Sequence, residues 1–106
     1  MIRGSIWWVE FDPAVGTEIH KTRPAVIVSN DTANKFLARV VVIPLTSNIS
    51  RVYPGEAVIT VNGSKSKAMT DQIMSADKSR LKNKIGELSN NDIVSLETAM
   101  KQFLNL

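Results

Sequence analysis

The chain has 106 residues, of which 43% are hydrophobic and 22% charged, as expected for one globular domain spanning residues 1–106. It contains no cysteine, which excludes disulfide bonds and thiolate metal sites. No apolar run approaches the roughly 20 residues needed to cross a bilayer, and no signal peptide opens the chain. We therefore expect a soluble, cytoplasmic protein without a membrane segment.

The net charge of +3 is unevenly distributed. Residues 65–84 carry six basic side chains against Asp71 and Asp77, a local net charge of +4. The basic residues of this stretch are Lys65, Lys67, Lys78, Arg80, Lys82 and Lys84. A localised basic stretch suits a polyanionic partner. The alternative is an ordinary solvated basic face.

Three apolar, β-branched runs in the first half predict strands, over residues 6–11, 24–29 and 39–45. The second run is continuously apolar, which is typical of a buried strand. Between these runs, 14–22 reads as a polar loop and Asn30-Asp31 as a turn. Pro44 predicts a position near a strand end or at an edge.

The second half predicts a polar loop over 47–54 and a strand over 56–61. Asn62-Gly63 favours a tight hairpin, with a return strand over 67–74. Ser89 is a good N-cap for a C-terminal helix, in which Ile93, Leu96 and Met100 follow at helical spacing. The expected fold is mainly β: a small barrel-like sheet with a C-terminal α-helix packed on it.

Several catalytic classes lack the residues that they need. His20 is the only histidine, which excludes a histidine-pair ribonuclease. There is no Gly-rich phosphate loop of the Walker type and no HExxH motif, so nucleotide hydrolysis and zinc proteolysis are unsupported. The carboxylates are scattered, which argues against a two-metal nuclease. Any catalysis should use isolated polar groups on loops.

Arg23 is the first candidate, because it lies where a polar loop enters a buried strand and is stiffened by Pro24. The planar guanidinium suits a phosphate, to which it donates two hydrogen bonds while remaining charged. The alternative is an arginine paired with Glu18 or Asp71 to hold the loop.

Two further groups of polar residues follow. Thr46, Ser47 and Asn48 come at the end of the third strand, where ordinary turn chemistry is the alternative. Asp71 and Gln72 fall inside the expected return strand, where a buried structural carboxylate is the alternative.

Five ordered blocks together resemble one family. They are Arg3-Gly4-x-Ile6-Trp7, Gly16-x-Glu18-x-x-Lys21-x-Arg23-Pro24 continuing to Asp31, Val42 to Ser47, Asp71-Gln72 continuing to Leu81, and Gly86-x-Leu88-Ser89. In this order and over nearly the whole chain, they resemble the MazF/PemK/Kid toxins. The resemblance implies an SH3-like barrel that forms a homodimer, as in the related gyrase poison CcdB. It also implies metal-free RNA cleavage, with no cofactor, and a MazE-like antitoxin encoded nearby.

The resemblance assigns catalytic roles to Arg23, Thr46 and Glu18. Two positions depart from some family members. Thr17 stands where those members have a histidine before the glutamate, and Met69 where they have an arginine before the Asp-Gln pair. An acid–base assignment at these two positions therefore fails here.

The reaction implied is attack of a ribose 2′-hydroxyl on its own phosphate, which leaves a 2′,3′-cyclic phosphate and a 5′-hydroxyl. Glu18 has suitable chemistry for the base if its pKa is raised, and His20 is a weaker candidate. Contacts to single-stranded RNA are expected from Thr17, His20, Lys21, Asn30, Ser47, Asn48, Arg51, Asp71 and Gln72.

An antitoxin with an acidic, disordered tail would cover this surface. Two alternatives remain at this point: a CcdB-like non-catalytic poison of DNA gyrase, and a non-catalytic SH3-like binding module.

Overall fold

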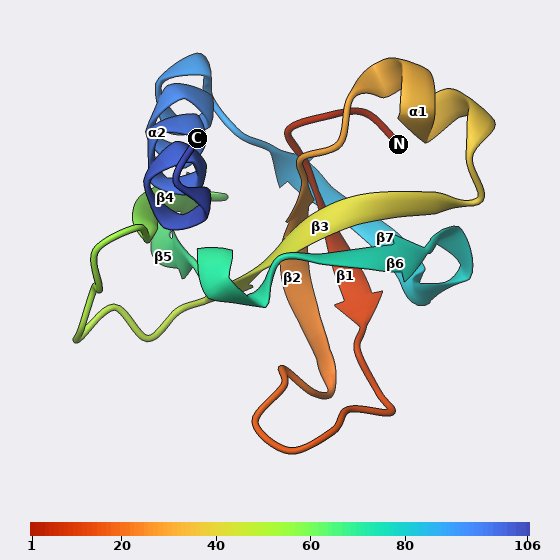
Figure 1. The fold of residues 1–106 in the computed structure, drawn as a ribbon, viewed down its shortest axis with the longest axis horizontal. Coiled ribbons are helices and arrows are strands. Elements are labelled where there is room, and N and C mark those ends of the chain that lie inside the picture. Colours follow the sequence, from red (N-terminus) through yellow and green to blue (C-terminus); the bar gives the residue numbers. More distant parts are fainter.

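Seven antiparallel strands form one strongly curled sheet, a half-barrel with the helices at one end (Figure 1). The computed structural model describes residues 1–106. In chain order the elements are β1 (Ser5–Glu10), β2 (Thr22–Ile27), α1 (Asp31–Phe36), β3 (Arg39–Thr46), β4 (Ala57–Val61), β5 (Ser64–Ala68), β6 (Met74–Asp77), β7 (Leu81–Glu87) and α2 (Asn90–Leu104). The strand order is β4-β5-β3-β2-β1-β7, and β6 pairs with the first half of β3. The predicted mainly β fold is confirmed.

The two central strands bury both of their faces, which explains their continuous apolar sequences. Val26 of β2 and Ile43 of β3 belong to one core, which includes Leu96 of α2. Their neighbours Ile27 and Val42 belong to a second core on the other face. The prediction of a buried strand over 24–29 is thus confirmed, because a strand buried on both sides has no polar alternation.

The C-terminal helix is confirmed and begins where expected. The Ser89 hydroxyl accepts a hydrogen bond from the Asp92 amide and caps α2. The Asp92 carboxylate accepts a hydrogen bond from the backbone N–H of Thr60 at 2.9 Å, which ties the first turn of the helix to β4. No helix of the structure is long and apolar enough to span a membrane.

The β4–β5 hairpin is confirmed, but its return strand differs from the prediction. Asn62 and Gly63 both have positive φ, 47° and 83°, as a tight two-residue turn requires. Pairing therefore resumes immediately, at Ser64, and β5 ends at Ala68. The chain then makes a short 3₁₀ turn over Thr70–Gln72 before β6. The single strand predicted over 67–74 was wrong.

Three elements were not predicted: α1, β6 and β7. Asn30-Asp31 is more than a turn, because the Asn30 side chain caps the one-and-a-half-turn helix α1. This helix buries only Asn34, so it lacks the apolar stripe by which a helix is recognised. Strand β7 is largely polar because it lies at the sheet edge beside β1.

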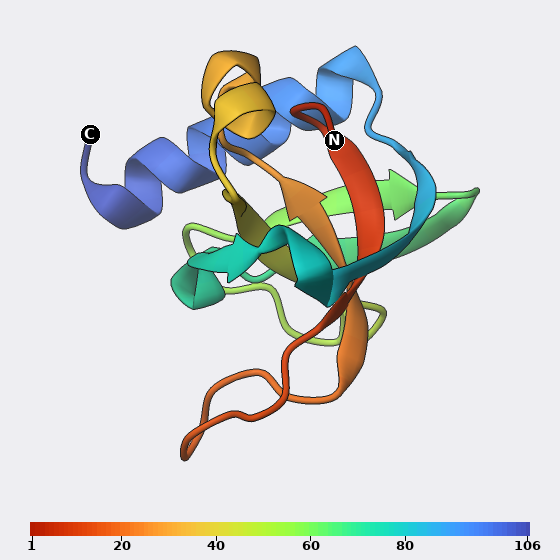
Figure 2. The same ribbon diagram turned by 90° about the vertical axis from the view of Figure 1, so that its right-hand side faces the viewer.

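The helices and the longest loop lie at opposite ends of the molecule. Figures 1 and 2 both show α1 at one end of the curled sheet and the β1–β2 loop, residues 11–21, extending from the other. Residues before α1 and residues of this loop therefore cannot share one site within a single chain.

Candidate functional site

Arg23 and Thr46 meet at the ends of neighbouring strands. The β2–β3 ladder ends at the pair Ala25–Pro44, and Arg23 and Thr46 each lie two residues beyond this pair on their own strand. Both residues line one surface hollow of about 370 Å³, which we call the Arg23 hollow. Its remaining lining residues are Trp8, Lys21, Thr22, Pro24, Leu45, Ser47 and Ser66. Two cations and several hydroxyl groups line this hollow, and none of its residues is acidic, so it is suited to an anion.

The Arg23 guanidinium is oriented by the loop that precedes it. Its Nε donates to the carbonyl oxygen of His20 at 3.1 Å. Neither terminal nitrogen has a hydrogen-bond or ion-pair partner in the chain, and the expected alternative pairing with Glu18 or Asp71 is absent. The fork that recognises a phosphate is therefore available.

The Thr46 hydroxyl accepts a hydrogen bond within a turn and can still donate one. Its Oγ1 accepts from the Asn48 amide at 3.2 Å, so the turn interpretation of this stretch is confirmed. A hydroxyl that accepts one hydrogen bond still has its own hydrogen to donate. Thr46 also lines a second hollow of about 310 Å³ together with Asn48, Arg51 and Lys67, which we call the Arg51 hollow.

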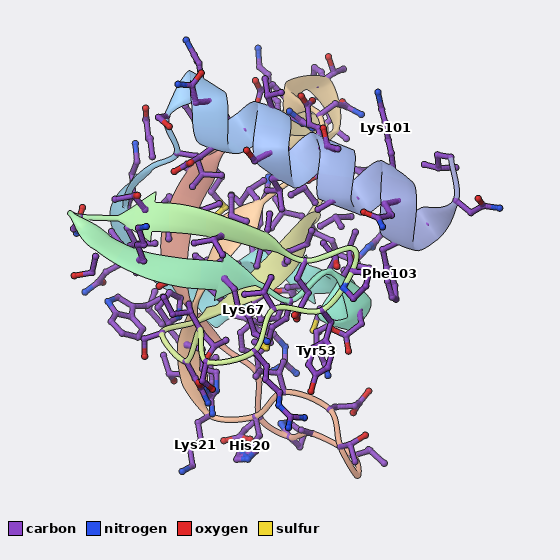
Figure 3. All side chains as sticks on the ribbon, turned by 90° about the vertical axis from the view of Figure 1, so that its left-hand side faces the viewer. His20, Lys21, Tyr53, Lys67, Lys101 and Phe103 are labelled. Atoms are coloured by element: carbon purple, nitrogen blue, oxygen red, sulfur yellow. The ribbon has the colours of Figure 1, made fainter.

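The loop before β2 carries Lys21 in a left-handed conformation, with φ of 67°. This conformation is uncommon for a residue with a side chain. The Asp12 carboxylate holds it by accepting from the Lys21 amide at 3.1 Å. Figure 3 shows His20 and Lys21 on the β1–β2 loop, pointing away from the sheet. The His20 side chain does not line the Arg23 hollow, whereas Lys21 does.

Glu18 lies in a different hollow from Arg23 and Thr46. This Glu18 hollow, of about 440 Å³, is also lined by Thr17, Asp71 and Gln72. Glu18 accepts from the Val15 amide at 2.7 Å, and Gln72 accepts from the Ile19 amide at 3.2 Å. The structure thus groups these four predicted residues in a hollow that neither Arg23 nor Thr46 lines.

Asp71 and Gln72 do not lie inside a strand. They belong to the 3₁₀ turn Thr70–Gln72, and Asp71 is exposed to solvent. The alternative of a buried structural carboxylate at Asp71 was therefore wrong.

Asn30 is separated from all the other predicted site residues. Its side chain accepts from the Ala33 amide at 2.8 Å and caps α1 at the opposite end of the molecule. A single chain therefore does not bring Asn30 to the same surface as Arg23.

The basic stretch over 65–84 is not one open cationic face. Five of its six cations bond within the chain: Lys67 to Glu56, Lys78 to the Asn34 carbonyl, Arg80 to the Glu10 and Asp12 carbonyls, Lys82 to Glu10, and Lys84 to Glu87. Hydrogen bonds from the side chain and backbone of Ser79 also lower the pKa of the Asp77 carboxyl, which keeps a negative charge within the stretch. The unpaired cations at the two hollows are instead Lys21, Arg23 and Arg51.

Trp8 is the main site residue that the sequence did not single out. It is 42% exposed and lines the Arg23 hollow, whereas Trp7 is half-buried and donates to Ser5 Oγ at 3.0 Å. Because successive side chains of a strand point to opposite faces, the sequence of β1 is compatible with one exposed tryptophan. It did not place that side chain beside Arg23, because this proximity depends on the β1–β2 pairing of Trp8 with Pro24. Aspartate, glutamate and histidine side chains nowhere gather in a group of three that could hold a metal ion.

Comparisons with known proteins bear on the sequence and the fold of the whole chain. The family model of the PemK-like, MazF-like toxin of type II toxin–antitoxin systems matches residues 2–104. Endoribonuclease MazF9 of Mycobacterium tuberculosis is 42% identical over 115 aligned positions, covering 100% of this chain and 98% of that protein. The solved structure of MazF from Deinococcus radiodurans superposes with a TM-score of 0.87 at 23% identity, covering 100% of this chain and 97% of that one. A mycobacterial endoribonuclease solved with its cognate antitoxin superposes with a TM-score of 0.84 at 23% identity, covering 100% and 96%. At these identities the two structures show that the fold is shared.

Proposed function

Because this chain belongs to the PemK-like, MazF-like toxins of type II toxin–antitoxin systems, we propose that this endoribonuclease cuts single-stranded RNA without a metal ion. Its products are a 2′,3′-cyclic phosphate and a 5′-hydroxyl. The observation that carries the proposal is the Arg23 hollow. There, a guanidinium with both terminal nitrogens free and a threonine hydroxyl, from the ends of neighbouring strands, line a space without a carboxylate. Such a space suits a phosphodiester and the extra negative charge that develops as it reacts.

Arg23 and Thr46 both stabilise the negative charge that develops on the phosphate during the reaction. The ribose 2′-oxygen forms a bond to its own phosphorus while the bond from phosphorus to the 5′-oxygen breaks. The 2′-hydroxyl loses one proton and the 5′-oxygen gains one, so no oxidant or external phosphate is needed. The terminal nitrogens of Arg23 stabilise the pentacoordinate phosphorane, a role worth about 3–4 kcal/mol per well-placed donor. The Thr46 hydroxyl donates to the same phosphate.

RNA continues from this phosphate into the neighbouring hollow. Thr46 lines both the Arg23 hollow and the Arg51 hollow, so one strand of RNA can pass from Lys21 to Arg51 along a chain of unpaired cations. Ser47 and Asn48 lie beside this path and offer hydrogen-bonding groups to bases. The exposed ring of Trp8 offers a stacking surface, which is typically worth about 1–3 kcal/mol per base.

We assign Glu18 to base recognition in preference to proton transfer. Its carboxylate lies in the Glu18 hollow with Thr17, Asp71 and Gln72, away from Arg23 and Thr46. Carboxylate and amide groups there accept and donate hydrogen bonds to base edges. His20 contributes through its carbonyl oxygen, which orients Arg23. We exclude Asn30 from the RNA surface because it caps α1.

An antitoxin would cover the same hollows. We propose a MazE-like partner with an acidic, disordered tail, since three unpaired cations and an exposed tryptophan accept negative and apolar side chains respectively. We further propose a homodimer, in which a second copy covers Phe36 and Leu37, exposed apolar residues at the end of α1. The proposed substrate, the messenger RNA of the cell, places the reaction in the cytoplasm.

Cleavage assays separate this proposal from its alternatives. Purified protein is incubated with a long single-stranded RNA in EDTA and, separately, in magnesium, and the new ends are mapped. We expect equal cleavage at a short recurring sequence, with cyclic phosphate and 5′-hydroxyl ends. Loss of cleavage in EDTA, or 5′-phosphate ends, would contradict the mechanism. A CcdB-like poison would leave RNA intact and trap DNA gyrase instead, and an SH3-like binding module would do neither.

A further inference from the structure

Lys67 is a buried lysine whose ammonium group bonds to two separate points of one loop. Its Nζ donates to the Arg51 carbonyl oxygen at 2.8 Å and to Glu56 Oε1 at 3.0 Å. The side chains of Lys67 and Glu56 are only 10% and 8% exposed. The ammonium also lies 5.1 Å from the centre of the Tyr53 ring. All of these contacts are to the β3–β4 loop, residues 47–56.

This loop has no regular secondary structure, so its shape depends on such contacts. Glu56 Oε1, the same oxygen that binds Lys67, also accepts from the Tyr53 amide at 2.8 Å. The Thr70 hydroxyl donates to the Gly55 carbonyl. Gly55 has φ of 86°, and a Cβ there would lie 3.2 Å from Cβ of Phe103, so α2 packs closely against the loop. Together these contacts fix the second half of the loop, with Lys67 at their centre.

Lys67 is also the cross-strand partner of Thr46 in the β3–β5 ladder. Lys67 therefore contacts the backbone of Arg51 through its side chain, and its main chain lies opposite that of Thr46 in the sheet. Thr46 and Arg51 both line the Arg51 hollow, as does Lys67 itself. Figure 3 shows Lys67 and Tyr53 on the face that carries this loop.

A buried ion pair is a poor device for stability alone. Its desolvation offsets most of its attraction, and an apolar pair of similar size is often as stable or more stable. A buried ion pair can, however, hold a catalytic group in place, and a displacement of about 1 Å in a positioning group can lower a rate about a hundredfold. The pair is therefore better suited to holding the loop in one conformation than to raising the melting temperature.

We propose that Lys67 is a positioning residue, which with Glu56 clamps the β3–β4 loop so that Thr46 and Arg51 contact consecutive phosphates of the RNA. The inference rests on the proposed ribonuclease function. It adds a specific requirement: although Lys67 also lines the Arg51 hollow, its ammonium group is engaged by the loop and acts through it, not through a bond to the RNA.

The test removes both charges of the clamp together, so that no unpaired charge is left buried. Lys67→Met combined with Glu56→Gln should melt at or above the temperature of the unaltered protein, while cleavage at saturating RNA falls at least tenfold. The amides of Tyr53 and Glu56 should also exchange with solvent at least tenfold faster. Lys101→Met serves as the matched control, since it removes one charge from the outer side of α2 (Figure 3) and should change neither the saturated rate nor the exchange.

Each outcome decides the inference. A stable double variant that cuts at the unaltered saturated rate overturns it. If the double variant does not fold, exchange in the unaltered protein decides. Amides of Tyr53 and Glu56 that exchange as fast as those of Ile49 and Val52, which donate no hydrogen bond, would show that no clamp exists. The exchange measurement needs no RNA and so judges the clamp alone. An unaltered protein that fails to cut RNA would instead refute the proposed function.

Discussion

Arg23 donates from Nε to the His20 carbonyl oxygen across 3.1 Å, and both terminal nitrogens of its guanidinium remain without partners in the chain. The loop therefore fixes the direction of the side chain and leaves the phosphate-binding fork unoccupied. Such preorganisation is what a donor aimed at a developing charge requires, because little reorganisation is needed when the charge appears.

We expect Arg23→Ala to lower the cleavage rate by about two orders of magnitude or more, as for loss of one transition-state donor. Arg23→Lys keeps the charge but loses both the fork and the Nε bond to His20, so it should recover only part of the rate. Single-turnover cleavage measures both, and circular dichroism controls for folding. A folded Arg23→Ala variant that cuts at nearly the original rate would remove the central residue of the mechanism.

Thr46→Val should be severe, again about a hundredfold, because it keeps the shape of the side chain but removes the hydroxyl. It also removes the acceptor for the Asn48 amide. Thr46→Ser retains the hydroxyl and is the matched control, with a rate expected within about tenfold of the original. Equal rates for the serine and valine variants would show that the hydroxyl has no chemical role.

Glu18→Gln tests whether this carboxylate reads a base or accepts a proton. Since Glu18 lies outside the Arg23 hollow, we expect the pH dependence of the cleavage rate to keep its shape. The preferred cleavage sequence should change, because an amide now presents a donor where the carboxylate accepted. Disappearance of the acidic limb of the pH–rate profile would instead identify Glu18 as the general base.

Asn30→Ala should affect folding but not cleavage. Loss of this N-cap is expected to cost about 1 kcal/mol of stability, or about 4–8 °C in melting temperature for a domain of this size. The cleavage rate and the cut sequence should stay unchanged at temperatures where the variant is folded. A change in cut sequence would return Asn30 to the RNA surface and imply that a second copy brings it there.

Inhibition by the antitoxin should be competitive with RNA. An acidic tail that occupies the Arg23 and Arg51 hollows should bind more weakly at high salt, because its attraction to Lys21, Arg23 and Arg51 is screened. Crosslinks should run from the tail to residues 17–23 and 46–51. An antitoxin that binds only the outer face of α2, while RNA still binds, would contradict this model of control.

The fold was predictable wherever a local pattern reflects burial. The apolar runs of β1, β2 and β3, the Asn62-Gly63 turn and the cap at Ser89 all follow from neighbouring residues. Helix α1 and strand β7 were missed because neither has an apolar periodicity: α1 buries only Asn34, and β7 lies at a sheet edge. The return strand was misplaced because residues 64–66 are polar, although the turn itself requires pairing to resume at Ser64.

The sequence indicated individual candidate residues of the site, but not which of them share a hollow. Arg23 and Thr46 were correctly expected at strand ends, and both line the same hollow. The basic stretch over 65–84 was misleading, since its cations find partners distant in sequence, such as Glu10 and Asn34. The burial of Lys67 could not be expected either, because it depends on an ion pair with Glu56, which lies just before strand β4.

The burial of β2 and β3 on both faces has a consequence for how such an enzyme diversifies. A shift of either strand would disturb two cores at once, so the geometry of Arg23 and Thr46 is tied to the integrity of the whole domain. The β1–β2 and β3–β4 loops carry no such constraint at their tips. New cleavage sequences should therefore arise by loop replacement alone. Transplanting residues 14–19 and 47–50 from a relative, which leaves His20 and Arg51 in place, should transfer its sequence preference while the reaction itself is retained.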